Sequence, residues 1–142
     1  MANIFDISKY IIEKTNEITS MKLQKLVYYS QVWFIVWEEE PLFDDKIEAW
    51  DSGAVIPILH KENKGYFKLN KDSFKKGESS KLSILEKENI DKVILHYGDK
   101  NSQWLSDLIH MEEPWNKAKR REKNSIKEEI TLADIHEYYS GL

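Results

Sequence analysis

The chain has no cysteine among its 142 residues. Without thiols it has no disulfide bond, no thiolate zinc site and no cysteine nucleophile. Such a composition suits a reducing compartment, so we expect the protein to act in the cytoplasm. Hydrophobic residues make up 41% and charged residues 32% of the chain, as in globular proteins. We therefore expect a single domain over residues 1–142 with its own core.

Long apolar stretches are also missing. The most apolar run, from Leu26 to Trp37, is shorter than the roughly 20 residues that a membrane span needs. The first residues lack the basic start, apolar middle and small-residue cleavage site of a secretion signal. We therefore expect no association with a membrane.

Glycine and histidine are few and scattered. The glycines are isolated, so no segment has the pattern of a phosphate-binding loop, and no two histidines have the spacing of metal ligands on a helix. His110 with Glu112 and Glu113 could form a general base with carboxylate support, but no activated nucleophile accompanies them. We expect no catalytic residues, metal or cofactor, and a protein that is not an enzyme.

Hydrophobic spacing predicts a mainly α fold. A first amphipathic helix runs from Ile4 to Lys14. A second helix starts after an N-cap at Thr19 or Ser20 and is apolar on nearly all its faces, which is typical of a helix at the centre of a domain. Pro41 ends it. The prediction is a compact single-domain helical bundle around a central apolar helix.

Weaker patterns follow the central helix. Residues 47–50 alternate in polarity, Gly53 supplies a turn, and we expect a short two-stranded β element near residues 47–69, with residues 66–69 as the second strand. Residues 70–80 read as an exposed loop.

Capping signals place the remaining helices. Ser83 and Glu86 form a capping box for a helix that ends at Gly98. Asn101 or Ser102 starts a short helix, Pro114 lies in the first turn of the next, and Thr131 with Asp134 opens the last helix. Residues 101, 102, 114, 131 and 134 are all of types favoured at helix starts.

Two segments carry opposite charge. Residues 38–51 contain seven acidic residues and one lysine, whereas residues 117–127 contain six basic residues and one acidic residue. The basic segment has no aromatic residue to stack on a base and no recognisable helix-turn-helix, and the net charge is −4. A solvated face is the usual explanation of each charged segment. The basic segment would serve an acidic protein partner about equally well, and a small nucleic-acid-binding regulator stays open as an alternative.

Several motifs together resemble one known family. They are Met21-Lys22-Leu23-Gln24-Lys25-Leu26, Tyr28-Tyr29, Gln31, Pro41-Leu42-Phe43, Ile47-Glu48-Ala49-Trp50, Gly53, Val55, Pro57, His110 and Pro114-Trp115. Their order is similar to that of the Panacea antitoxin domain, also called the SocA-like or phage-associated GepA-like domain, over about residues 19–118. The departures are modest: the family usually has proline where Ala54 stands and threonine where Ile109 stands.

The resemblance implies an antitoxin of a bacterial or prophage toxin–antitoxin pair, which neutralises a co-encoded protein toxin by direct binding. One branch of the family resembles a proteolytic adaptor, which implies a cytosolic protease as a further partner. No catalytic residues are established for the family. We expect the partner-binding residues to lie in the acidic segment, at the following turn and in the distal motif: Glu38, Glu39, Asp44, Asp45, Trp50, Gly53, His110 and Trp115.

Overall fold

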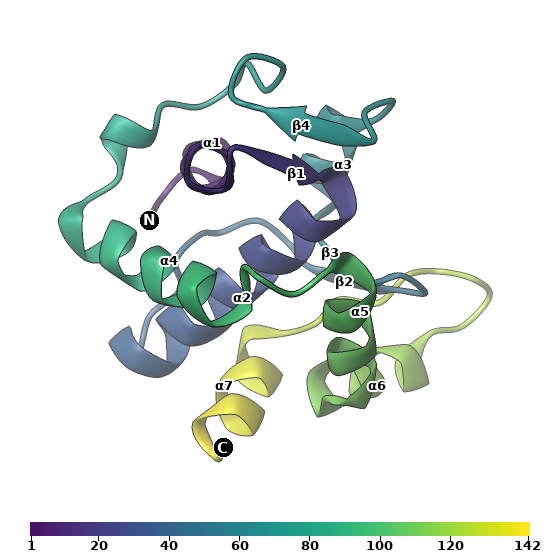
Figure 1. Cartoon of the computed structure of the whole chain (residues 1–142). Coiled ribbons are helices and arrows are strands. Elements are labelled where there is room, and N and C mark those ends of the chain that lie inside the picture. The colour runs from purple at the N-terminus through teal and green to yellow at the C-terminus, as the bar shows by residue number, and fades with distance from the viewer.

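The computed structural model describes all residues 1–142 and shows seven α-helices with two small sheets (Figure 1). The elements in chain order are α1 (Ile4–Thr15), β1 (Glu17–Thr19), α2 (Ser20–Glu38), β2 (Glu48–Trp50), β3 (Gly53–Val55), α3 (Pro57–Asn63), β4 (Lys68–Asn70), η1 (Ser79–Lys81), α4 (Ile84–Tyr97), α5 (Ser102–Met111), α6 (Glu113–Arg121) and α7 (Leu132–Ser140). None of these helices has the length and hydrophobicity that crossing a bilayer requires. The predicted mainly helical fold is confirmed.

Helix α2 runs through the middle of the molecule, with α1, α4, α5 and α7 packed around it (Figure 1). Every residue from Leu23 to Val32 is buried, because neighbouring elements cover all sides of this half of the helix. The Thr19 hydroxyl caps the helix by accepting the Lys22 amide at 3.1 Å. The helix ends where Glu39 takes a left-handed conformation (φ 59°), two residues before Pro41. The prediction of a central, buried helix is confirmed.

The strand pairing differs from the prediction in one respect. Strand β2 pairs with β3, in a hairpin that turns between Trp50 and Gly53, and not with residues 66–69. Gly53 has φ 127°, which reverses the chain directly after β2, so the nearest apolar segment becomes the partner. Residues 68–70 instead form β4 and pair with β1, burying Ile18 opposite Leu69.

Residues 71–78, between β4 and η1, lack regular structure, as predicted for a loop over residues 70–80, but they are not wholly exposed. Phe74 is buried in the core, and Lys9 of α1 donates to the carbonyl of Lys71 at 2.6 Å and to that of Phe74. One aromatic residue therefore fixes a loop that is otherwise polar.

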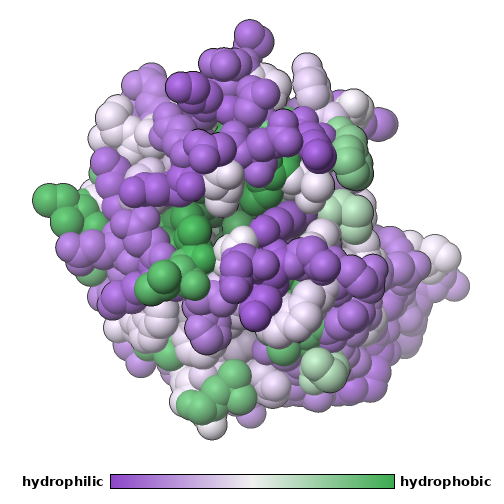
Figure 2. Space-filling view, viewed as in Figure 1, coloured by the Kyte–Doolittle hydropathy of each residue, from purple (hydrophilic) through white to green (hydrophobic).

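The C-terminal helices begin where their caps predict. Ser83 and Glu86 form the reciprocal capping box of α4, Asn101 caps α5, and the Thr131 hydroxyl accepts the Asp134 amide at 3.1 Å at the start of α7. Most of the face shown in Figure 2 is hydrophilic, but apolar side chains reach it over α4, on the left of the view.

Candidate partner-binding surface

Four of the eight predicted site residues meet where the β2–β3 hairpin packs against α5 and α6. The Trp115 indole nitrogen donates to the Trp50 carbonyl at 2.9 Å. The His110 ring lies 4.2 Å from the Trp115 ring, centroid to centroid, and its Nε2 is 2.8 Å from the Asp51 carbonyl oxygen. Residues 59 and 65 positions apart in the sequence therefore form one junction, with Gly53 at its turn.

The His110 ring is held at both nitrogens by backbone carbonyls. Nε2 faces the Asp51 oxygen, and Nδ1 faces the Ser106 oxygen one helical turn earlier. Nδ1 is also 3.4 Å from the Ser106 hydroxyl oxygen. These contacts tie the ring to the hairpin turn on one side and to α5 on the other, so the geometry gives His110 a role in holding the hairpin turn.

Gly53 and Trp50 have different surroundings at this junction. Gly53 is buried, and a Cβ there would meet Lys25 Cε at 3.6 Å and Ile109 Cδ1 at 3.8 Å, which are ordinary contacts. Its positive φ therefore explains the glycine better than lack of space does. Trp50 is half-buried, and its ring lies edge-on to His60 with the centroids 4.9 Å apart.

Two glutamines of α2 hold the segment between α2 and α3. Gln24 accepts the Ile56 amide at 2.8 Å and donates to the Ile56 carbonyl at 3.2 Å. Gln31 does the same for Phe43, and accepts the Leu42 amide as well. Both glutamines are buried, so these family-motif residues stabilise the scaffold and do not form part of its surface.

A buried carboxyl group joins α2, α7 and the α5–α6 junction. Glu112 Oε1 accepts hydrogen bonds from the hydroxyls of Tyr29 at 2.6 Å and Tyr139 at 2.7 Å, and the Tyr28 hydroxyl lies 3.1 Å from that of Tyr139. Burial raises the pKa of Glu112 above its usual value, while the two tyrosine hydrogen bonds oppose that shift. Sequence reasoning paired Glu112 with His110, but the structure pairs it with tyrosines.

The other four predicted site residues lie toward the opposite end of α2. Glu38 accepts a hydrogen bond from Asn89 of α4 at 3.1 Å, and Glu39 lies 2.7 Å from His136 Nε2 of α7. Asp44 and Asp45 follow Phe43, and burial together with Asp44 raises the pKa of Asp45. Thirteen residues of helix separate Lys25, beside the hairpin, from Glu38, or about 20 Å. The predicted residues thus form two separate groups.

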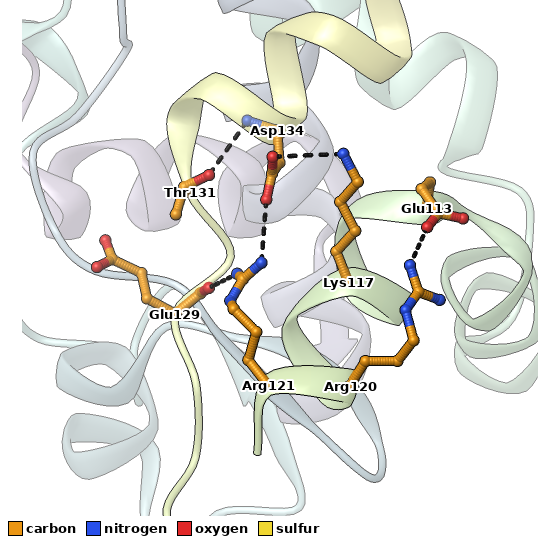
Figure 3. A network of polar contacts seen from close by, with 7 residues as sticks. All are labelled: Glu113, Lys117, Arg120, Arg121, Glu129, Thr131 and Asp134. Atoms are coloured by element: carbon orange, nitrogen blue, oxygen red, sulfur yellow. Dashed lines mark hydrogen bonds and ion pairs between the residues drawn. The ribbon is translucent and has the colours of Figure 1, made fainter.

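The basic segment of residues 117–127 is largely neutralised within the chain (Figure 3). Asp134 of α7 pairs with Lys117 at 3.8 Å and with Arg121 at 3.5 Å, and Arg120 pairs with Glu113. The remaining pairs are Lys119 with Asp51 and Glu122, and Lys127 with Glu122. Five of its six basic residues have an acidic partner, which weakens the case for a nucleic-acid surface.

A surface that the sequence reasoning did not identify lies between α2 and α4. This α2–α4 groove, of about 400 Å³, is lined by Trp33, Trp37, Lys92, Val93, Leu95, His96 and Tyr97. The rings of Trp33 and Trp37 stack with centroids 5.6 Å apart, and Trp33 donates to the Tyr97 hydroxyl at 2.9 Å. Trp37 is 43% exposed and Leu95 is 86% exposed. In the sequence, the spacing of Trp33 and Trp37 by one helical turn was the feature that could have indicated this surface.

No group of three or more histidine, aspartate or glutamate side chains is arranged to hold a metal ion. The motif residues Gln24, Gln31, His110 and Trp115 contact mainly backbone atoms of this chain, so they hold its segments together. The fold is that of a small helical domain. The family profile "Antitoxin SocA-like, Panacea domain" matches residues 23–116, and the chain belongs to this family. Membership supports an antitoxin-type role. Comparisons with curated proteins and with solved structures give no significant match.

Proposed function

We propose that the protein is an antitoxin that neutralises a co-encoded toxin by direct protein–protein binding, and that the α2–α4 groove is its contact surface. The observation that carries this proposal is the stacked pair of half-buried Trp33 and exposed Trp37 in a concave apolar site of an antitoxin-family member. We further propose that it acts in the cytoplasm, which suits a chain without cysteine.

Physical chemistry supports the groove as a docking surface. A partly exposed tryptophan has much apolar area left to bury, and tryptophans in concave sites are frequent among the residues that dominate binding energy. Acidic residues follow the groove directly at Glu38, Glu39 and Glu40. A toxin segment with an apolar face and flanking basic residues would match both features, and the charge would speed the encounter.

The test uses the toxin encoded by a neighbouring gene and a pair of matched tryptophan variants. Trp37→Ala should weaken toxin binding about 10- to 100-fold, measured by calorimetry, and should abolish growth rescue on co-expression. Trp104→Ala on α5 is the control, because Trp104 is 45% exposed and lies outside the groove. Equal effects of the two substitutions would rule out the groove, and a wild-type chain that binds no neighbouring gene product would refute the antitoxin role.

A proteolytic adaptor is the second candidate. An adaptor needs separate sites for its cargo and its protease. The predicted binding residues lie in two groups, and Glu38 of one group is about 20 Å along α2 from Lys25, which lies beside the hairpin of the other. The half-life of the toxin should then lengthen in cells that lack the protease. A half-life that does not depend on the protease would leave direct blocking as the mechanism.

A further inference from the structure

A second cavity, of about 360 Å³, lies beside the N-terminal half of α2, between that helix, α3 and the β2–β3 hairpin. We call it the Lys25 pocket. Among its lining residues are Met21, Lys25, Trp50, His60, Asn63 and Tyr66. No aspartate or glutamate lines it, whereas Lys25 and Lys64 both do. The charged side chains that line the pocket are therefore all positive.

Lys25 is a buried cation without a counter-charge. Lys25 is only 2% exposed, and no carboxylate lies within salt-bridge distance of its ammonium group. The ammonium has two long contacts, 3.4 Å to the Met21 carbonyl and 3.5 Å to the Ser102 hydroxyl. Burial lowers the pKa of Lys25 to about 8, so the group is still mostly protonated at neutral pH. A buried charge in this state is unfavourable unless something pairs with it.

Asn63 adds a second unsatisfied group to the same pocket. The residue is 5% exposed, and neither its amide nitrogen nor its amide oxygen has a hydrogen-bond partner. By contrast, Gln24 in the same lining has both amide atoms engaged by Ile56. Buried polar groups are nearly always paired, so an orphaned amide and an unpaired ammonium in the lining of one pocket point to a missing ligand.

The unpaired groups call for an anion with oxygen acceptors. Of the two lysines in the lining only Lys25 is buried, and one buried ammonium with one buried amide suits a carboxylate, whereas proteins generally meet phosphate with clusters of arginine or lysine. Met21 and Tyr66 are both more than half exposed and line the pocket along with Trp50, so apolar surface is available beside the charge. A polypeptide that carries a carboxylate fits this combination.

We propose that the Lys25 pocket binds a carboxylate of the partner protein, from an acidic side chain or from the chain's C-terminus, through the Lys25 ammonium and the Asn63 amide. This inference rests on the proposed toxin-binding role only for the source of the carboxylate. It adds a specific polar anchor, at the hairpin end of α2, to the apolar contact proposed for the α2–α4 groove.

Small peptide probes test the pocket without any toxin. The probes are acetyl-Ala-Glu-Ala-amide, acetyl-Ala-Ala with a free C-terminal carboxylate, and acetyl-Ala-Gln-Ala-amide, each titrated into the full chain and followed by NMR. At least one carboxylate probe should shift the Asn63 side-chain amide and the Trp50 indole signals, and the glutamine probe should bind about tenfold more weakly or not at all. Whichever carboxylate probe binds more tightly identifies the source.

Variants then assign the effect to the pocket. Lys25→Met should weaken carboxylate binding about tenfold or more, and toxin binding by a similar factor. Lys22→Met is the matched control, because Lys22 is also a lysine and lies about one helical turn before Lys25. It does not line the pocket, and its ammonium donates to the Gly98 carbonyl.

Three results would overturn the proposal: binding of the glutamine probe as tight as that of the tighter carboxylate probe, no binding of any probe, or equal losses from Lys25→Met and Lys22→Met. The probe comparison on the wild-type chain stands even if a variant fails to fold. A chain that binds the toxin but no carboxylate probe refutes the pocket alone, whereas a chain that binds no toxin refutes the antitoxin role.

Discussion

The side-chain amide of Gln31 holds the backbone of Phe43 at both of its polar ends. Nε2 donates to the Phe43 carbonyl at 2.8 Å, while Oε1 accepts the amides of Leu42 at 2.7 Å and Phe43 at 3.4 Å. Gln24, two helical turns earlier on the same face, binds Ile56 in the same way. Two side chains of the central helix thus serve as the hydrogen-bond partners that a neighbouring strand would otherwise supply.

Gln31→Leu is expected to lower the free energy of unfolding by about 2–4 kcal/mol, because it leaves a buried carbonyl and a buried amide unpaired. Urea unfolding followed by circular dichroism measures the change. Gln103→Leu is the control, since Gln103 is exposed and bonds only to Asp107 one turn away. If the two variants are equally stable, the Gln31 contacts contribute little.

Glu112→Gln should become more stable than the wild-type chain as the pH rises. Folding raises the pKa of Glu112, so the folded chain binds more protons than the unfolded chain. This extra proton binding stabilises the fold below about pH 4.5, and the stabilisation is lost as the pH rises through the pKa of the folded state. Glutamine keeps an oxygen for both tyrosine hydroxyls and carries no charge. Unfolding free energies of both proteins from pH 4 to pH 8 should therefore diverge, and parallel curves would contradict the prediction.

Lys25→Met should raise the free energy of unfolding at pH 7 by about 2 kcal/mol, because it removes a buried, unpaired charge and keeps an apolar chain of similar length. The pKa of about 8 in the folded state lies below the usual 10.5, so the wild-type chain gains stability as the pH rises across that window. The advantage of the variant should therefore shrink toward pH 10.5. Thermal unfolding of both proteins at pH 7 and pH 10.5 measures it, with exposed Lys123→Met as the control. A destabilised Lys25→Met variant would instead indicate a structural role for Lys25.

Arg121→Ala should loosen α7 without affecting any binding to DNA. Arg121 donates to the Glu129 carbonyl at 3.0 Å and pairs with Asp134 at 3.5 Å, so its loss should cost about 0.5–1 kcal/mol of stability. Fluorescence anisotropy with duplex DNA at several salt concentrations provides the second measurement. A DNA affinity that falls with the substitution, with a salt slope smaller by about one, would revive the nucleic-acid alternative.

Prediction from sequence worked best where local chemistry decides the structure. Helix starts at Thr19, Ser83 and Asn101 follow from short-range hydrogen bonds between a cap and the next turn, and all three are confirmed. It failed for β1 and for the partner of β2, because strands of three residues carry almost no periodic signal and their pairing depends on where helices bring them.

For the candidate site, the sequence motifs single out residues, and only the fold shows what these residues contact. His110 and Trp115 stood out as a distant motif, and only the fold shows that both bind backbone atoms of residues 50–51. The acidic residues Glu38 and Glu39 looked continuous with Trp50 along the chain. In space they lie toward the opposite end of α2 from the hairpin, since the segment between them runs back along that helix.

The sequence by itself determined the helical class, the central place of α2 and the Panacea family, because hydrophobic spacing, caps and motif order are all written along the chain. Only the tertiary structure decided that Glu112 meets Tyr29, that the basic segment is neutralised by residues such as Asp134, and that Lys25 lies buried without a carboxylate. These facts depend on contacts between residues far apart in the chain. Their energies come from the burial and pairing of charges, which no local pattern encodes.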